Sequence, residues 1–237
     1  MREVQWLLTI ALIVSSFSYV ACGSTGSEDD GGGTNDEGPL EVYEIQTASD
    51  VERLPAPDVD GCVRGEIRIE HSELETLDIL NDIECIDGQL WIVRNENLRT
   101  IDGFSSLRRM EGPDAEEPPW IDGGSIFIAR NPELTSIEGF TALQHATGGL
   151  WLGANENLSE LPGFRSLTTL EEILVFATLS PDDPIHPSLV DQSEITSLEW
   201  FSNLETVGFV ELVGLPGLTS LNGLDPIEGE RLQVTGT

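Results

Sequence analysis

The sequence predicts an all-β protein in which short parallel strands stack into a solenoid. Two observations lead to this fold class: a phrase that recurs along the chain, and an apolar spacing that switches between two and three residues. Units that recur about every 21–25 residues are typical of repeat architectures, in which each unit packs only against its neighbours. The clearest copies are DGQLWIVRNENLRTIDGF (87–104), GGSIFIARNPELTSIEGF (123–140) and GGLWLGANENLSELPGF (148–164).

The apolar spacing within a copy indicates strands and corners. The stretch 90–92 and its equivalents alternate with a period of two, as a short strand does. The step then becomes three, whereas a helix needs about 3.6 and would be weakened by glycines such as Gly103 and Gly163. We therefore expect each copy to form one coil, with neighbouring coils about 4.8 Å apart. The clearest run of threes is Leu158, Leu161, Phe164, Leu167 and Leu170.

The N-terminus predicts export. The apolar run 6–14 is short for a membrane span and fits a secretory signal. The stretch YVACG at 19–23 resembles the lipobox of bacterial lipoproteins, in which cleavage precedes a cysteine that then carries lipid. This resemblance implies a signal peptide over 1–21, lipidation of Cys22 and, from Gly23, an outer-membrane or cell-surface anchor. Secretion after Ala21, or an uncleaved anchor, is the alternative; each of these predicts an extracytoplasmic protein.

The composition restricts the partners and the chemistry. The chain has 43 acidic and 11 basic residues, a net charge of −32, and its basic residues are all arginine. A chain this acidic repels the phosphates of nucleic acids and anionic lipids. We therefore expect no nucleic-acid partner, and contact with the membrane only through the lipid anchor. Without lysine there is no Walker A loop, Schiff-base lysine or Ser-Lys dyad. Residues 22–40, acidic and rich in glycine, are expected to be a disordered tether.

Cys62 and Cys85 are an even pair in an oxidising compartment, where a disulfide is the default. A metal site would need more Cys or His nearby than His71 provides. We therefore predict a structural disulfide, no metal and no cofactor. Residues 41–61 form a lead-in to the repeats at 62–237.

The repeat, with C62-V-R-G65-E-I-R-I and C85-I-D-G88-Q-L-W-I, resembles the receptor L domain. That module binds ligands in insulin- and epidermal-growth-factor-receptor ectodomains and also occurs in bacterial surface proteins. The resemblance implies a right-handed parallel β-solenoid of about six coils over residues 62–237. In that family a cysteine pair staples the first coil, which supports pairing of the two cysteines. A leucine-rich-repeat horseshoe is the alternative, but its consensus leucine follows the asparagine by two residues, whereas here the spacing is three.

Two columns of equivalent residues have a structural interpretation. An inward ring column is expected to belong to the core, continued by Leu224. An asparagine column stands where each strand must bend, and its amides can bond the turn backbone and each other; a ligand-binding row is the less favoured alternative. The columns are Phe104, Phe140, Phe164 and Phe201, and Asn95, Asn131 and Asn155.

A third column is the candidate binding site. A residue whose two neighbours point inward itself points outward, which selects Trp91, Phe127, Trp151 and Leu174. Val93, Ala129 and Phe176 are expected beside this stripe, with Arg68, Glu211 and Gln233 further along the stack. Monomers rarely expose such apolar stripes without use. Flat aromatics suit either a protein's apolar patch or the faces of sugars, so the expected partner is a protein or a polysaccharide.

Two inserts, 111–122 and 178–192, border the candidate site. Trp120, with acidic neighbours at 114, 116 and 117, is expected to help frame a ligand, because loops on a rigid scaffold commonly carry binding. The alternative is that the inserts, or residues 41–58, fold over the stripe and make it ordinary core.

The sequence does not predict an enzyme. Glycan cleavage needs carboxylates that converge on a groove, whereas the acids here fall mainly at corners such as Asp102 and Glu138. The histidines lie apart, and Asp182, Asp183 and His186 match no EF-hand loop. We expect a non-catalytic, surface-anchored binding protein. A purely structural envelope or assembly protein, stacked through residues 232–235, is the first alternative, and a glycan-active enzyme the second.

Overall fold

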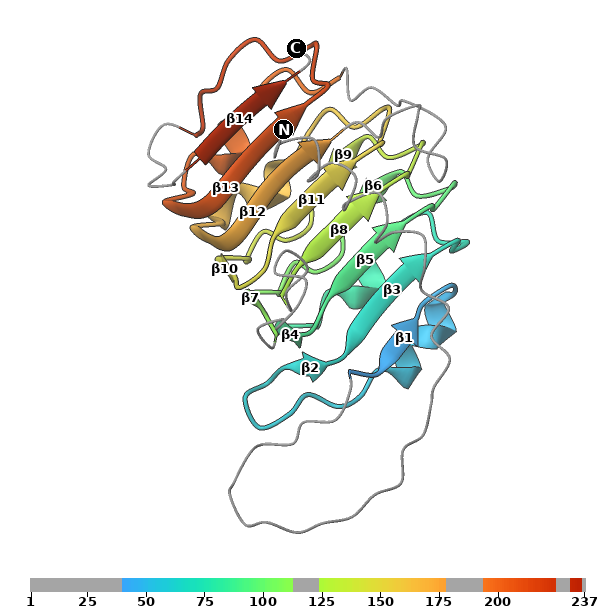
Figure 1. The fold of residues 1–237 in the computed structure, drawn as a ribbon. Helices are drawn as coiled ribbons and strands as arrows, with labels where there is room; N and C mark the ends of the chain where they lie inside the picture. Colours follow the sequence, from blue (N-terminus) through green and yellow to red (C-terminus); the bar gives the residue numbers. More distant parts are fainter. Residues whose placement is uncertain (1–39, 113–123, 178–193, 225–230, 236–237) are drawn as a thin grey trace, which may run out of the picture.

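The computed structural model describes residues 40–112, 124–177, 194–224 and 231–235. It is built mostly of strands that pair in parallel into one curled, solenoid-like sheet with almost no helix (Figure 1). The expectation of an all-β, parallel stack is confirmed at this level. The expected signal peptide (1–21), Cys22 and all but residue 40 of the expected tether (22–40) lie outside the described residues.

The main sheet carries the candidate site. Its strands follow one another along the stack in chain order, so that each repeat adds one strand beside the last (Figure 1). The strands are β1 (Val42–Glu44), β3 (Glu66–Glu70), β5 (Leu90–Val93), β8 (Ile126–Ala129), β11 (Leu150–Gly153), β12 (Thr169–Ala177), β13 (Thr206–Val213) and β14 (Arg231–Thr235).

A second row of shorter strands closes another side of each repeat. It joins the main sheet because β12 spans both rows: Thr169 and Leu170 pair with β10, and residues 174–177 pair with β11. In the described part of the chain, a third side has one short strand pair and an isolated bridge between Ser136 and Glu160. The second row is β2 (Val63–Arg64), β4 (Cys85–Asp87), β7 (Arg109–Glu111) and β10 (His145–Ala146), and the third side is β6 (Thr100–Ile101) and β9 (Ser136–Ile137).

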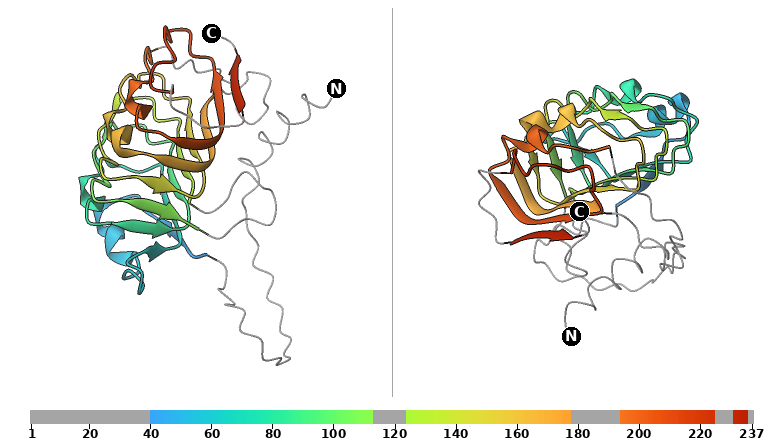
Figure 2. Two further views of the ribbon diagram at one scale, coloured as in Figure 1. Left: turned by 90° about the vertical axis from the view of Figure 1, so that its left-hand side faces the viewer. Right: turned by 90° about the horizontal axis from the view of Figure 1, so that it is seen from above.

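The run with a period of three passes through a short helical turn. Leu158, Leu161, Phe164, Leu167 and Leu170 are all buried, as expected. Residues Pro162–Ser166, however, form a 3-10 helix, η3, in place of an extended piece; a 3-10 helix has three residues per turn and also produces this spacing. The described 3-10 turns lie on the side opposite the main sheet (Figure 2). The others are η1 (Ala48–Arg53), η2 (Asp78–Leu80) and η4 (Glu199–Phe201).

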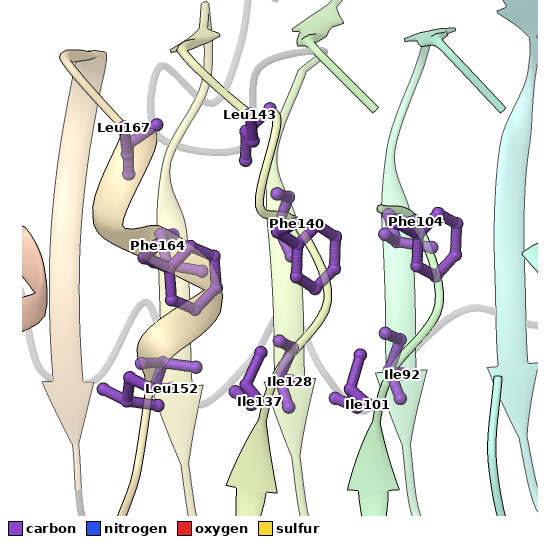
Figure 3. Close-up of a cluster of buried hydrophobic side chains, with 14 of the residues drawn as sticks. Ile92, Ile101, Phe104, Ile128, Ile137, Phe140, Leu143, Leu152, Phe164 and Leu167 are labelled. Carbon is purple, nitrogen blue, oxygen red and sulfur yellow. The ribbon is translucent and has the colours of Figure 1, made fainter. Parts of the chain in front are cut away.

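The core is a set of columns parallel to the stack. Phe104, Phe140, Phe164 and Phe201 are fully buried and stacked, with successive ring centroids 5.3, 5.4 and 5.8 Å apart. Figure 3 shows the first three of these rings. Leu224, expected to continue the column, is partly buried and packs against the core. Each repeat therefore buries its apolar face against the next, and the stack shares one core.

The asparagine column holds the corners together. Asn95, Asn131 and Asn155 are all 0% exposed. Asn131 Oδ1 accepts hydrogen bonds from Asn95 N (3.0 Å) and Asn95 Nδ2 (3.1 Å), and Asn155 Oδ1 accepts from Asn131 N (3.0 Å). The Nδ2 atoms of the three asparagines donate to carbonyl oxygens of the preceding repeats. The amides thus bond the backbone and each other, and the structural interpretation of this column is confirmed.

The residue before each asparagine adopts a left-handed conformation. Arg94 and Arg130 both have φ of 58°, and Ala154 has φ of 52°. This conformation disfavours side chains other than Gly, Asn and Asp. The ladder of amide hydrogen bonds that follows it compensates for the strain, so each corner depends on its asparagine.

Candidate functional site

The candidate site is a stack of aromatic rings on the outer face of the main sheet. Trp91 pairs with Phe127, and Phe127 with Trp151, in the register of β5, β8 and β11. The ring centroids of Trp91 and Phe127 are 4.0 Å apart with planes 14° apart, and those of Phe127 and Trp151 are 5.8 Å and 22° apart. The two indoles are partly exposed, and Phe127 between them is 9% exposed. We call these three residues the aromatic stripe.

Leu174 does not belong to the stripe, and its prediction was wrong by one residue. Leu174 pairs with Leu150, is 0% exposed and lies in the core. Val175 is the residue in register with Trp151, and Val175 is 1% exposed. Phe176 was shifted by the same error: it is in register with the inward Leu152 and contacts Phe201 edge-on in the core.

The apolar face is wider than the sequence indicated. Val93 and Ala129 flank the stripe in register, as expected. On its other side Gly149 lies in the same outward column as Ile173 and Phe209, both partly exposed. Val213 of β13 is partly exposed as well. Phe209 lies two residues before the outward Glu211, so the alternation in β13 already indicated it, whereas Ile173 of β12 becomes readable only once Leu174 is placed inside.

Charged residues lie at both ends of the stripe. Beyond Trp91 the register continues to Arg68 and Glu44, and beyond Val175 it continues to Glu211 and Gln233. The guanidinium carbon of Arg68 lies 5.9 Å from the centre of the Trp91 ring, within cation–π range. Arg68 also pairs with Glu66. At the other end, burial of Glu211 raises the pKa of its carboxyl above the ordinary value.

The two indole N–H groups differ in their partners. Trp91 Nε1 donates to Gln89 Oε1 at 3.0 Å. Gly149 occupies the place of Gln89 in the repeat of Trp151, and a Cβ added there would lie 3.1 Å from Trp151 Nε1. Among the described residues nothing accepts a hydrogen bond from Trp151 Nε1, although the atom is buried.

The lead-in segment extends the sheet instead of covering the stripe. β1 pairs with β3 at the N-terminal edge, and Ile45 N donates to Arg68 O at 2.7 Å. Val51 and Leu54 pack against the end of the core. The two inserts fall almost entirely outside the described residues. Those residues leave out 113–123, which contains Trp120, and 178–193, which contains Asp182, Asp183 and His186.

The cysteine pair forms the expected disulfide. Cys62 and Cys85, 23 residues apart, are bonded, and both are buried. Asp58 Oδ1 accepts from Cys62 N and Asp60 N, both at 2.9 Å, and the hydrogen bond from Cys62 N holds the pKa of Asp58 below its ordinary value. Glu111 lies beside the pair, and this is the one cluster of metal-ligand types in the described part of the chain. Because both sulfurs are in a disulfide, the cluster offers a single carboxylate and does not fit a metal site.

The described histidines lie at separate places in the fold. His71 Nδ1 is 3.7 Å from Glu70, whereas His145 Nε2, on the second row of strands, is 3.3 Å from Glu171. Neither histidine is on the strands that carry the aromatic stripe. The stripe itself offers ring edges and one indole donor, which suit recognition more than proton transfer.

Comparison of the chain with protein-family models, curated proteins and solved structures gave no match. Within the described residues there is no helix with the length and apolar character needed to span a membrane.

Proposed function

We propose that the chain is a non-catalytic binding protein, held outside a bacterial cell by lipid on Cys22, that recognises a macromolecule along the aromatic stripe. The observation that carries this proposal is the stack of Trp91, Phe127 and Trp151 on the outer face of the main sheet. Aromatic residues on a rigid sheet supply large contact area at a small cost in conformational entropy, which is how hot spots of interfaces are built.

The fold that accompanies this proposal is a right-handed parallel β-solenoid of about six coils, of the receptor L-domain type. The parallel registers and the disulfide between the first two repeats support it. In this proposal the sheet is a binding platform, the acidic tether separates it from the membrane, and the partner is a protein or a polysaccharide at the cell surface.

A structural assembly role is the second candidate, and the open ends of the sheet favour it. In the described residues β1 pairs only with β3, and β14 only with β13. Unpaired edges of this kind are templates for adding another strand. Concentration-dependent oligomers that survive substitution of the stripe would favour this role.

The test compares the full-length chain with a Trp91→Ala/Phe127→Ala/Trp151→Ala variant and with Ile79→Ala. Ile79 is an exposed apolar residue on η2, away from the main sheet, and serves as the matched control. After circular dichroism shows that all three are folded, their retention on immobilised envelope proteins and polysaccharides is measured. We expect the native chain and the control to be retained and the triple variant to be lost. Equal retention of all three would refute the stripe as the binding face.

A further inference from the structure

The orientation of the rings in the aromatic stripe narrows the kind of partner. A sugar stacks on the flat face of an aromatic ring, where the negative side of the quadrupole meets its C–H groups. In this chain those faces are turned toward one another, because the planes of Trp91 and Phe127 are 14° apart and those of Phe127 and Trp151 are 22° apart. Phe127 therefore has an indole on each side, and the stripe presents mainly ring edges.

The outer faces of the stack are also engaged. Arg68 lies over the far side of Trp91, and its guanidinium group is held by Glu66. Beyond Trp151 the next register position is occupied by Val175. The described stripe thus lacks a platform wide enough for a pyranose ring, and it offers hydrocarbon edges to an apolar side chain instead.

Trp151 Nε1 gives a second, independent indication. It is buried, and among the residues that the structure describes it has no acceptor, whereas the equivalent atom of Trp91 donates to Gln89. A buried donor is normally satisfied. A ligand that brings a carbonyl oxygen would complete this hydrogen bond, and a polypeptide backbone carries one at every residue.

The charges around the stripe specify the flanks of the partner. At one end Glu44, Glu66 and Glu70 surround Arg68; Glu66 pairs with Arg68 and Glu70 with Arg94, so three carboxylates outnumber two guanidinium groups there. Glu211 lies at the other end. Between them the described outward positions of β5, β8 and β11 carry no charge. A complementary partner is apolar in its centre and basic on its flanks. A second copy of this chain, with its net charge of −32, would bring the same acidic ends and is disfavoured.

We infer that the aromatic stripe binds a protein segment with an apolar centre and basic flanks, which supplies a backbone carbonyl to Trp151 Nε1. This inference rests on the proposed function, since it names the partner of the same face. A protein of this kind has side chains for the ring edges and an acceptor for the indole, whereas a polysaccharide would need the flat ring faces that the stack conceals.

The test uses the full-length chain and a synthetic peptide array in which the centre is apolar or Ser/Gly and the flanks are Arg or Glu in every combination. Soluble hexasaccharides of glucose, xylose and N-acetylglucosamine are tested in parallel. We expect binding to peptides with an apolar centre and Arg flanks, weakened roughly 2- to 12-fold by Trp151→Phe, because that change removes one hydrogen-bond donor and keeps a ring. Ile79→Ala should bind as the native chain does.

The remaining outcomes separate this inference from the proposed function. If a hexasaccharide binds and the triple alanine variant does not bind it, the partner is a glycan: the inference fails and the stripe remains a binding face. If the native chain forms dimers and the triple variant does not, the partner is a second copy of the chain: the inference again fails and the stripe remains a binding face. Equal binding of Glu-flanked peptides, or an unaltered affinity in Trp151→Phe, also overturns the inference. Should no probe and no envelope fraction distinguish the triple variant from the native chain, both the inference and the proposed function fail.

Discussion

Replacing Asn131 by alanine tests the assignment of the asparagine column to structure. The Asn131 side chain takes part in four hydrogen bonds: Oδ1 accepts from Asn95 N and Asn95 Nδ2, and Nδ2 donates to Ile92 O (2.9 Å) and Asn155 Oδ1 (3.2 Å). At about 0.5–1.5 kcal/mol net for each bond, the loss is about 2–6 kcal/mol. That is a large part of the 5–15 kcal/mol typical of a folded domain.

The assay is urea denaturation followed by circular dichroism, with Asn157→Ala as the control. Asn157 is exposed, and its side chain makes one hydrogen bond to the described residues, from Nδ2 to Pro132 O, so its substitution should cost less than about 1 kcal/mol. We expect Asn131→Ala to lower the free energy of unfolding by several times more than Asn157→Ala. Near-equal losses would refute the argument that buried amides hold the corners, and would reopen the column as a ligand-binding row.

Three further predictions concern the core, the disulfide and one acidic residue. Phe140→Ala, which removes a ring stacked on both sides, should cost about 3–5 kcal/mol by urea denaturation; a cost no greater than that of Phe127→Ala on the outer face would contradict the shared core. Cys62→Ser/Cys85→Ser should lose about 3 kcal/mol, because the bond closes a loop between residues 23 apart, and an unchanged unfolding midpoint would speak against it. Burial raises the pKa of Glu211 above its ordinary value of 4.5. The protonated carboxyl therefore contributes to stability in full below pH 4.5, and this contribution is lost as the pH rises through the pKa of the folded state. Glu211→Gln should therefore gain stability relative to the native chain at neutral pH but not below about pH 4; thermal melts that show the same difference at both pH values would rule this out.

The parallel stack and its main columns could be predicted because two features of the repeat mark the two ends of each strand. In the first complete copies, glycines before the strand and an asparagine after it fix which residues point inward. Trp91, Phe127 and Trp151 were placed outward for this reason, and the register confirms it. The phenylalanine and asparagine columns follow from the same constraint.

The register of β12 could not be read from the sequence with the same certainty. No glycine pair precedes the apolar run 173–176 as Gly148 and Gly149 precede β11: Glu171 and Glu172, which lie within β12, stand before it. The run itself has no polar residue to mark its outer face. A slip of one residue turns every side chain to the opposite face, which is how Leu174 was assigned to the stripe. Only strand pairing distinguishes the two registers, and the same error hid Ile173.

The chemistry of the stripe depends on contacts between repeats, which the sequence of one repeat does not contain. Alternation places Trp91 and Trp151 outward but does not say whether their rings lie flat on the sheet or stack against each other. Nor does it indicate that Gln89 accepts a hydrogen bond from one indole, whereas the other indole, beside Gly149, has no acceptor among the described residues. The orientation of the rings and the hydrogen bonding of the indoles, which decide the kind of partner that the aromatic stripe suits, therefore become visible only in the structure.

Hydroxyl-radical footprinting of the full-length chain, free and bound to the envelope fraction that retains it, tests the central claim most directly. Oxidation of Trp91, Phe127 and Trp151 would be compared between the two states, with the buried Phe164 as the internal reference. If the aromatic stripe is the binding face, oxidation of these three side chains falls on binding while the remaining exposed residues keep their rates. If the chain binds and the three side chains oxidise as fast as before, recognition takes place elsewhere on the molecule.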